Sequence, residues 1–489
     1  MSLNSNNLKQ VAIKGFFWSA IEKFGTLGIQ FIITLILARL LTPADFGLVG
    51  MLAIFIAISQ SFINSGFGSA LIQKKSPTAE DYSTVFYFNI VVSFLFYFLL
   101  FIAAPYIAAF YKQPELIKLT RVISLGFIFN AFGLIQITQL TKNINFKTQS
   151  KVSITVVIIS GTIGITLALL GYGVWALVFQ TLTTSLFRTI FYWIINKWRP
   201  LWVFSKHSFK TLFSFGSRLL MAGLIDTIYK NIYLIIIGKF FNASALGYFT
   251  QAKTLQEIPV VSITGIIQRV TYSLFSEIQD EKQRLYNGYT KIIHLAIFIT
   301  FPLMLGLSAV SNNFISVVLT EKWLPSVPYL QLLCFAGMLY PIHAINLNII
   351  NVMGRSDLFL RLEIIKKTII TISIFVGIIW GVLGLVIGSV ITSFIALIIN
   401  TYYTGHLIGY GTKKQFIDLL PYFIVASIMA FLVFVVGYLL GTGFGVLVIQ
   451  IFLGLTIYTI LARIFKLKAY VEAKEIIIKF VPNKLKFLL

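Results

Sequence analysis

Long apolar stretches, separated by short polar segments, recur along almost the whole chain. A helix needs about 20 mostly apolar residues to cross the hydrocarbon core of a membrane. By that measure the pattern predicts about 14 spans, at 15–38, 46–67, 83–104, 117–139, 152–170, 174–195, 212–238, 246–270, 289–310, 328–352, 366–382, 384–404, 417–439 and 443–462. We expect each span to be helical, because lipid offers no hydrogen-bond partner to open backbone groups. The predicted fold class is therefore an all-α integral membrane protein.

The composition agrees with a chain surrounded by lipid. Of its 489 residues, 58% are hydrophobic and only 11% are charged, whereas about 25% of the residues in a soluble domain are charged. These values exclude a soluble enzyme, a coiled coil and a disordered protein. The single Cys excludes a disulfide framework and a cysteine-rich metal site. The polar segment 1–14 lacks a small-residue cleavage site, so we expect no signal peptide.

The net charge is +23, and the positions of the basic residues along the chain are more informative than this total. Cytoplasmic loops of membrane proteins are enriched in Lys and Arg. If the N-terminus is cytoplasmic, most basic residues between the predicted spans fall in inner loops and few fall in outer loops. The pattern therefore predicts that both chain ends lie in the cytoplasm. In 465–489, basic residues alternate with apolar ones, which predicts an amphipathic tail on the anionic inner leaflet rather than a nucleic-acid-binding tail.

Two parts of the chain repeat in register. LARLLTPADFG at 37–47 matches IGKFFNASALG at 237–247, and GVWALV at 173–178 matches GVLGLV at 381–386. Six predicted spans separate the copies, and an even number keeps them in the same orientation, so the repeats are parallel. Parallel repeats are typical of transporters with a site between two lobes, and duplication in a channel or scaffold is the alternative. The predicted parts are an N-lobe (1–205), a C-lobe (206–410), an added helix pair (411–464) and the basic tail (465–489).

Motifs for covalent chemistry are missing from the sequence. No phosphate-binding G-x-x-x-x-G-K-[ST] loop is present, and the four His residues form no H-E-x-x-H motif. The predicted loops are too short for a folded catalytic domain. We therefore predict no enzyme activity, no cofactor and no metal site.

Charged residues inside the spans are the remaining candidates for function, because ionisable groups in a bilayer are costly and usually face a cavity or a partner. The first, seventh and eighth predicted spans hold Glu22, Lys23, Arg218, Asp226, Lys230, Lys253 and Glu257. Asp226 precedes Lys230 by four positions, and Lys253 precedes Glu257 by four. That spacing places both members of each pair on one helical face.

We interpret the basic members as a substrate site. Lys23, Arg218, Lys230 and Lys253 are predicted to line a central cavity and to bind a phosphate group of an anionic substrate. The acids Glu22, Asp226 and Glu257 would tune these bases or bind a coupling cation. The structural alternative is that each acid neutralises a base between packed helices, or that Lys23 and Arg218 extend to the cytoplasmic interface.

Four motifs resemble those of a known family. They are GFFWSA at 15–20, ARLLTPADFG at 38–47, LGYF at 246–249 and EKWLP at 321–325. The chain resembles polysaccharide flippases of the MOP superfamily, in the branch of lipopolysaccharide, colanic-acid and teichuronic-acid exporters. The resemblance extends over nearly the whole chain. Relatives of this branch include the multidrug extruders (MATE) and the lipid II flippase, so the resemblance implies their two-lobed fold.

The resemblance implies a multi-pass protein of the bacterial inner membrane. Such a protein moves undecaprenyl-pyrophosphate-linked oligosaccharide repeat units to the outer leaflet by alternating access, for assembly of surface polysaccharide. Its implied partners are the lipid-linked oligosaccharide, membrane lipids, and a polysaccharide polymerase with its chain-length machinery. In the lipid II flippase, basic residues of the central cavity are tied to the pyrophosphate, and Glu22 and Lys23 fall in the comparable part of the first helix. The alternatives are a multidrug or cation antiporter of the same superfamily and a membrane polysaccharide polymerase.

Overall fold

The computed structural model describes residues 5–64, 66–472 and 474, which form helices and connecting turns without a β-strand. Eleven segments of this described part are long and apolar enough to cross a membrane. The prediction of an all-α integral membrane fold is therefore confirmed. One of the eleven, Ser356–Ile408, contains two long helices, and the two helices between Lys206 and Glu277 are not among them. The number of 14 spans stays a prediction.

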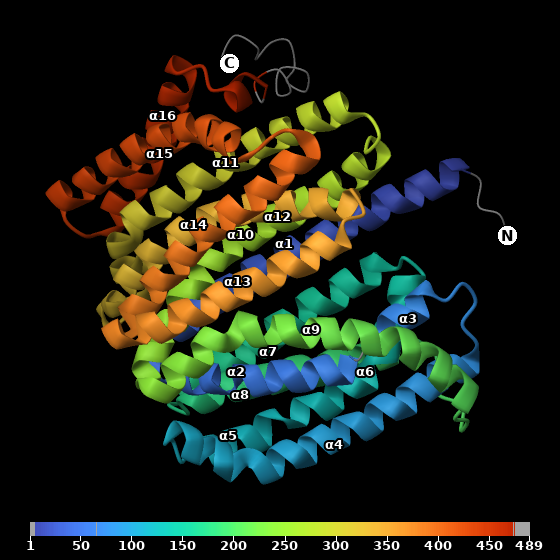
Figure 1. Ribbon diagram of the computed structural model, residues 1–489. Helices are drawn as coiled ribbons and strands as arrows, with labels where there is room; N and C mark the ends of the chain where they lie inside the picture. The colour runs from blue at the N-terminus through green and yellow to red at the C-terminus, as the bar shows by residue number, and fades with distance from the viewer. Residues whose placement is uncertain (1–4, 65, 473, 475–489) are drawn as a thin grey trace. The chain divides into compact units, whose positions relative to one another are not determined.

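The chain divides into two compact units, Met1–Gly247 (unit 1) and Tyr248–Leu489 (unit 2). Unit 1 contains α1 (Ser5–Leu40), α2 (Pro43–Asn64), α3 (Phe67–Gln73), α4 (Ala79–Tyr111), α5 (Leu116–Ile123), α6 (Leu125–Lys142), α7 (Phe146–Leu169), α8 (Val174–Ile195), α9 (Lys206–Phe240) and the start of α10 (Ala243–Glu277) (Figure 1).

Unit 2 contains the remainder of α10, α11 (Lys282–Phe314), the short helices η1 (Ile315–Leu319) and η2 (Glu321–Ser326), α12 (Val327–Val352), α13 (Ser356–Gly377), η3 (Ile378–Trp380), α14 (Gly381–Ile408), α15 (Thr412–Leu440) and α16 (Phe444–Ile464). The predicted lobes, 1–205 and 206–410, and the added pair, 411–464, stay predictions. Most of the predicted tail, 465–489, lies outside the described residues.

Helices that are distant in sequence lie side by side in unit 1. α1 packs along α7, α2 packs against α9, and α6 lies between α4 and α8 (Figure 1). The contact of α1 with α7 is close, because a Cβ atom added at Gly161 would lie only 2.0 Å from Cδ1 of Ile33. Small residues at a helix contact let two backbones approach, and this is a common way to pack helices in a membrane.

The two copies of the repeated turn contact each other within unit 1. A Cβ atom added at Gly47 would lie 1.8 Å from the carbonyl oxygen of Ala243, the first residue of α10. A Cβ atom added at Gly247 would lie 1.8 Å from the carbonyl oxygen of Pro43, the first residue of α2. Only glycine permits such an approach of two backbones. The glycine that ends each copy of the repeat therefore contacts the start of the helix in the other copy.

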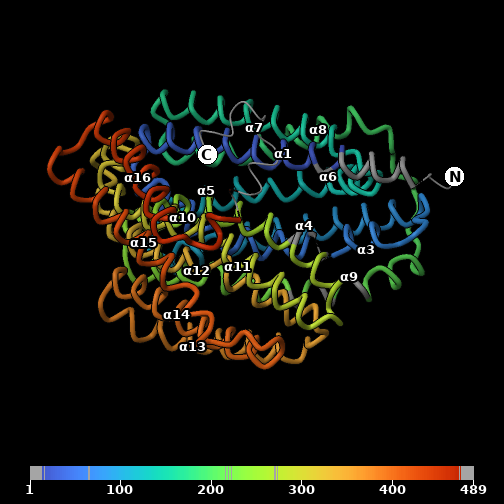
Figure 2. Tube along the Cα trace, turned by 90° about the horizontal axis from the view of Figure 1, so that it is seen from above, coloured from blue at the N-terminus to red at the C-terminus, as the bar shows by residue number. Residues whose placement is uncertain are grey.

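In unit 2, α12 packs between α11 and α14, while α13 lies beside α14 and α15 lies beside α16 (Figure 2). A buried amide contact ties the C-terminal end of α11 to α16, since Nδ2 of Asn313 on α11 donates to Oε1 of Gln450 on α16 at 3.0 Å. The backbone N–H of Gly443 donates to Oδ1 of the same Asn313 at 2.9 Å. Such hydrogen bonds fix helices to one another where lipid supplies no hydrophobic drive.

The described start of the tail is folded onto unit 2. The backbone N–H of Ala469 donates to the Tyr422 hydroxyl at 3.1 Å, and Nζ of Lys468 lies 3.8 Å from Oδ1 of Asp418. Tyr410 donates its hydroxyl to Oδ2 of the same carboxylate at 2.6 Å. Burial, and then this hydrogen bond to Asp418, raises the pKa of Tyr410 far above its usual range, so the phenol stays protonated and able to donate.

Candidate functional site

Glu22 and Lys23 of α1 have different surroundings. The Oε1 atom of Glu22 accepts a hydrogen bond from Oγ of Ser153 on α7 at 2.7 Å. This acid therefore takes part in the packing of α1 on α7. The Lys23 side chain is half-buried and makes no ion pair with any residue that the structure describes.

Asp226 and Lys230 of α9 form an ion pair with 2.7 Å between Oδ2 and Nζ. Both side chains are exposed, 52% for Asp226 and 68% for Lys230. The neighbouring Thr227 instead contacts α2, with its Oγ1 atom 3.3 Å from Oγ of Ser61. The helix α9 therefore contacts α2 through Thr227, while the Asp226–Lys230 ion pair lies on an exposed part of the α9 surface. Arg218 also lies on α9, but its side chain is outside the described part of the structure.

Lys253 and Glu257 lie on the part of α10 that belongs to unit 2. Their charged atoms are 3.7 Å apart, with the side chain of Lys253 25% exposed and that of Glu257 50% exposed. Gln256 between them is buried against α12, since a Cβ atom added at Gly337 would lie 2.1 Å from its Nε2 atom. The cavity that would bring the bases of α1, α9 and α10 together stays a prediction.

A charged group on α13 was missed by the sequence interpretation. The Glu363 carboxylate binds two ammonium groups, with Nζ of Lys366 at 2.5 Å and Nζ of Lys367 at 3.8 Å. All three side chains are at least three-quarters buried. Lys366 is ten residues after the start of α13, or about 15 Å along the helix. The sequence analysis places no site on this helix, yet the spacing of the acid at i−3 from Lys366 and i−4 from Lys367 is a visible signal for a charged group within the helix.

A second polar group links α12 and α14 in unit 2. Nε2 of His343 lies 3.2 Å from Oγ of Ser393, and Nδ1 of His343 lies 3.3 Å from Nδ2 of Asn400. Because the Asn400 amide nitrogen can only donate, Nδ1 of the imidazole accepts and Nε2 carries the proton. Oδ1 of Asn400 is buried and has no hydrogen-bond partner among the described residues. The sequence offered only a lone His, which carries no signal for this group.

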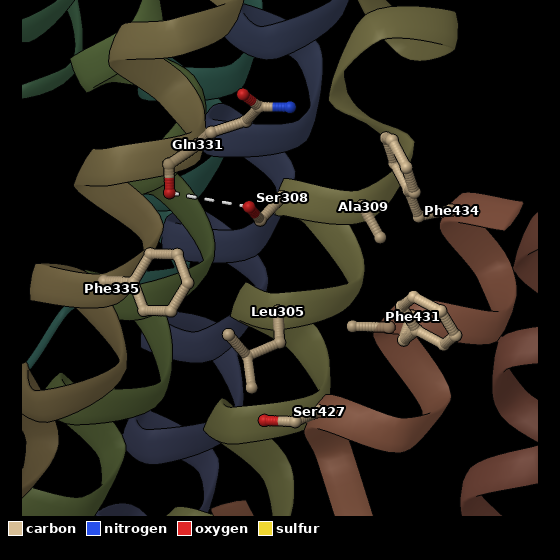
Figure 3. Close-up of a pocket in the computed structure, with 9 residues that line it drawn as sticks. Leu305, Ser308, Ala309, Gln331, Phe335, Ser427, Phe431 and Phe434 are labelled. Atoms are coloured by element: carbon tan, nitrogen blue, oxygen red, sulfur yellow. Dashed lines mark hydrogen bonds between the residues drawn. The ribbon is translucent and has the colours of Figure 1, made fainter. Parts of the chain in front are cut away.

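Unit 2 also contains an apolar hollow of about 250 Å³ between α11, α12 and α15. Figure 3 shows Leu305 of α11 between Phe335 of α12 and Phe431 of α15. The polar members are few, and Oγ of Ser308 donates to the backbone carbonyl of Gln331 at 3.5 Å. Such a lining suits a hydrocarbon chain rather than a charged group. Within the described residues, no group of three or more His, Cys, Asp or Glu could hold a metal ion.

Comparison with known proteins gives a family match and curated relatives. The family described as "Polysaccharide biosynthesis protein" matches residues 36–328. The teichuronic acid biosynthesis protein TuaB of Bacillus subtilis is 31% identical over 353 residues, which cover 72% of this chain and 73% of TuaB. The lipopolysaccharide biosynthesis protein WzxC of Escherichia coli is 25% identical over 377 residues, 76% of each chain. The succinoglycan biosynthesis transport protein ExoT of Rhizobium meliloti is 25% identical over 325 residues, 66% of each chain.

Solved structures show the same fold. The lipid II flippase MurJ in an inward closed conformation has a TM-score of 0.71 at 17% identity, covering 93% of this chain and 98% of MurJ. An inward-facing multidrug resistance transporter of the MATE family in the MOP superfamily has a TM-score of 0.62 at 16% identity, covering 79% of this chain and 98% of that chain. The prediction of a MATE-like and lipid II flippase-like fold is confirmed.

Proposed function

Because the chain belongs to the polysaccharide biosynthesis protein family, we propose that it is a flippase that moves lipid-linked oligosaccharide repeat units across the bacterial inner membrane. The similarity to TuaB over about three-quarters of both chains carries this proposal. The names of WzxC and ExoT agree with it, since they refer to lipopolysaccharide biosynthesis and succinoglycan transport. The product would be surface polysaccharide, built by a polymerase and its chain-length machinery after the repeat unit has crossed.

The physical task explains why charges are placed in helices. A sugar-phosphate headgroup cannot cross about 30 Å of hydrocarbon unaided. A protein must supply polar and cationic groups along the path and leave the polyprenyl tail in an apolar medium. We propose that Lys23, Arg218, Lys230 and Lys253 bind the pyrophosphate of the undecaprenyl carrier during alternating access.

The acids near these bases have a separate proposed part. Asp226 and Glu257 each pair with a base, which would hold that base in place until the pyrophosphate arrives. Glu22 and these two acids would tune the bases or bind a coupling cation. No bond of the substrate is made or broken in this step, so we propose a transporter and not an enzyme.

We further propose that both chain ends are cytoplasmic and that 1–205 and 206–410 act as two lobes, followed by 411–464 and the tail 465–489. The excess of basic residues in the predicted inner loops supports the orientation. The reciprocal contact of Gly47 and Gly247 supports a parallel repeat of these parts.

Gene deletion tests the proposed function. In a strain without a second flippase, we expect lipid-linked repeat units to accumulate in the inner leaflet and surface polysaccharide to disappear. A plasmid copy of the gene should restore the polysaccharide. If the repeat units still reach the outer leaflet in the deletion strain, the proposed function is wrong.

A further inference from the structure

Unit 1 has a hollow of about 380 Å³ where three turns meet. The turns join α1 to α2, α4 to α5 and α7 to α8, and the charge count predicts all three to be on the outer side of the membrane. We call it the outer hollow, and its lining includes Asp45, Glu115, Lys118, Tyr172 and Trp175. Its volume falls in the range of small-molecule sites, which begins at about 300 Å³.

The carboxylate of Asp45 is held in one orientation at the edge of the outer hollow. Its Oδ2 atom accepts hydrogen bonds from the Thr42 backbone N–H at 2.8 Å and from the Thr42 hydroxyl at 2.6 Å. The backbone N–H of Asp45 donates in return to the Thr42 hydroxyl oxygen at 3.3 Å, which makes a reciprocal cap at the start of α2. Oδ1 accepts no hydrogen bond from the described residues and faces Gly173, where an added Cβ atom would lie 3.4 Å away. One carboxylate oxygen is thus fixed and available.

Two aromatic side chains lie on the opposite turn. Gly171 has φ +82° and Gly173 has φ +54°, a left-handed backbone that favours glycine. These two glycines set the direction of Tyr172 between them, whose side chain is 55% exposed. Trp175 follows in the first turn of α8 and is half-buried beside Phe179, with 6.0 Å between the ring centroids. The faces of both rings carry negative π charge, which suits the partly positive C–H faces of a pyranose ring.

The charged side chains of the outer hollow fit a ligand with several hydroxyl groups better than a pyrophosphate or a metal ion. Glu115 and Lys118 are exposed at the start of α5. Together with Asp45 they provide hydrogen-bond acceptors and a donor, as sugar hydroxyls require. The two acids outweigh the single base, so a pyrophosphate would be repelled. Two carboxylates also fall short of a metal site, and no group of three or more metal-ligating side chains occurs among the described residues.

We propose that the outer hollow is a saccharide subsite, which binds a sugar of the transported repeat unit when its headgroup has reached the outer side. This proposal rests on the proposed flippase function, and it assigns a second site besides the one for the pyrophosphate. Tyr172 and Trp175 stack on the sugar ring, while Asp45, Glu115 and Lys118 bind its hydroxyl groups.

A binding measurement on the purified full-length protein tests the subsite. The ligand is the water-soluble repeat-unit oligosaccharide, released from the surface polysaccharide of the host bacterium. We expect Tyr172→Ala and Asp45→Asn each to raise its Kd at least about ten-fold, or about 1.4 kcal/mol. Asn at position 45 retains an acceptor for the Thr42 cap, so folding is preserved. Trp380→Ala is the matched control, because Trp380 is 67% exposed and stands in the second copy where Tyr172 stands in the first.

Three outcomes would overturn the subsite. They are no binding to the wild-type protein, an unchanged Kd in Tyr172→Ala and Asp45→Asn, and an equal loss in Trp380→Ala. The lipid-linked unit in nanodiscs should compete with the free oligosaccharide. Competition by the finished polymer alone would contradict the assignment to the transported unit. Failure of the flippase function itself is seen separately, as wild-type protein that does not move lipid-linked units between leaflets.

Discussion

The two copies of the repeat in unit 1 share their backbone and differ in their charges. Gly47 and Gly247 make the same contact in opposite directions, and both turns have a capped helix start. In the first copy Thr42 and Asp45 cap each other, and in the second Oδ1 of Asn242 accepts from the backbone N–H of Ala245 at 2.7 Å. Ala245 stands at the place of Asp45, so the second copy lacks the outer carboxylate.

The leading helices of the two copies also use their acids differently. Glu22 of α1 is hydrogen-bonded to Ser153 in a helix contact, whereas Asp226 of α9 forms an exposed pair with Lys230. The reciprocal backbone contact is what the proposed duplication predicts, and we infer from the differences that the two copies have separate tasks. The first copy uses its acids to fix positions, at Glu22 and Asp45, and the second uses its acid to hold a base that remains exposed. The predictions below test this division.

The largest effect is expected where the copies are alike. Gly47→Val or Gly247→Val places side-chain atoms where the backbone of the other copy lies, 1.8 Å from a carbonyl oxygen. The backbones cannot separate without loss of the helix contact, so we expect destabilisation above about 3 kcal/mol. Little protein should be recovered, as measured by size-exclusion chromatography in detergent.

Gly28→Ala is the control for this change, because a Cβ atom added at Gly28 of α1 has no neighbour within 4 Å. We expect normal recovery and normal surface polysaccharide in that variant. Normal recovery of Gly47→Val would show that the two turns are not in contact.

The next largest effect is expected at the exposed Asp226–Lys230 pair, where transport and stability should respond differently. Lys230→Ala should abolish export of surface polysaccharide, because it removes a proposed pyrophosphate ligand. An exposed ion pair at i, i+4 contributes only about 0.3–0.5 kcal/mol, so the melting temperature should hardly change. Lys23→Ala and Arg218→Ala should likewise abolish export at unchanged protein levels. Normal surface polysaccharide in all three variants would restrict these bases to a structural role.

A loss of stability is expected for Glu22, the acid of α1. Glu22→Ala removes the acceptor for the Ser153 hydroxyl in the contact of α1 with α7. The loss should be about 1–3 kcal/mol in the free energy of unfolding. Ser153→Ala in the Glu22→Ala background should then have little further effect, as a double-mutant cycle of thermal unfolding would show. Additive losses would mean that the two side chains act independently.

The smallest effect is expected at the two helix caps, Thr42 and Asn242. Thr42→Ala and Asn242→Ala each remove a helix cap and should each lower stability by about 1 kcal/mol. Only Thr42→Ala also frees the carboxylate of Asp45, so only this variant should bind the repeat-unit oligosaccharide more weakly. If both variants bind the oligosaccharide equally well, the Thr42 cap does not contribute to binding in the outer hollow.

The sequence was most informative where a local pattern decides the structure. The predicted span 174–195 coincides with α8, and the predicted span 417–439 lies within α15. The spacing of Asp226 and Lys230 on one helix leads directly to their ion pair, since neighbours at i, i+4 share a face. The repeat at 37–47 and 237–247 also pointed to two equivalent turns, though not to their mutual contact.

Contacts between distant segments could not be predicted in this way. Nothing near Glu22 in the sequence indicates that it meets Ser153, because that contact depends on how α7 packs on α1. The outer hollow combines Asp45 and Tyr172 from turns far apart in the chain, and neither residue is unusual in its own loop. The group at Glu363 could have been predicted, because the acid and its two lysines are spaced at i, i+3 and i, i+4 on one helix.

The central claim is tested most directly by translocation in proteoliposomes. The purified protein is reconstituted with the lipid-linked repeat unit, and the share of oligosaccharide that a membrane-impermeant glycosidase can cleave from outside is followed over time. We predict that wild-type protein makes nearly all of the oligosaccharide accessible, while protein-free liposomes and the Lys230→Ala variant leave the inner-leaflet share protected. Equal protection with and without the wild-type protein would contradict the account.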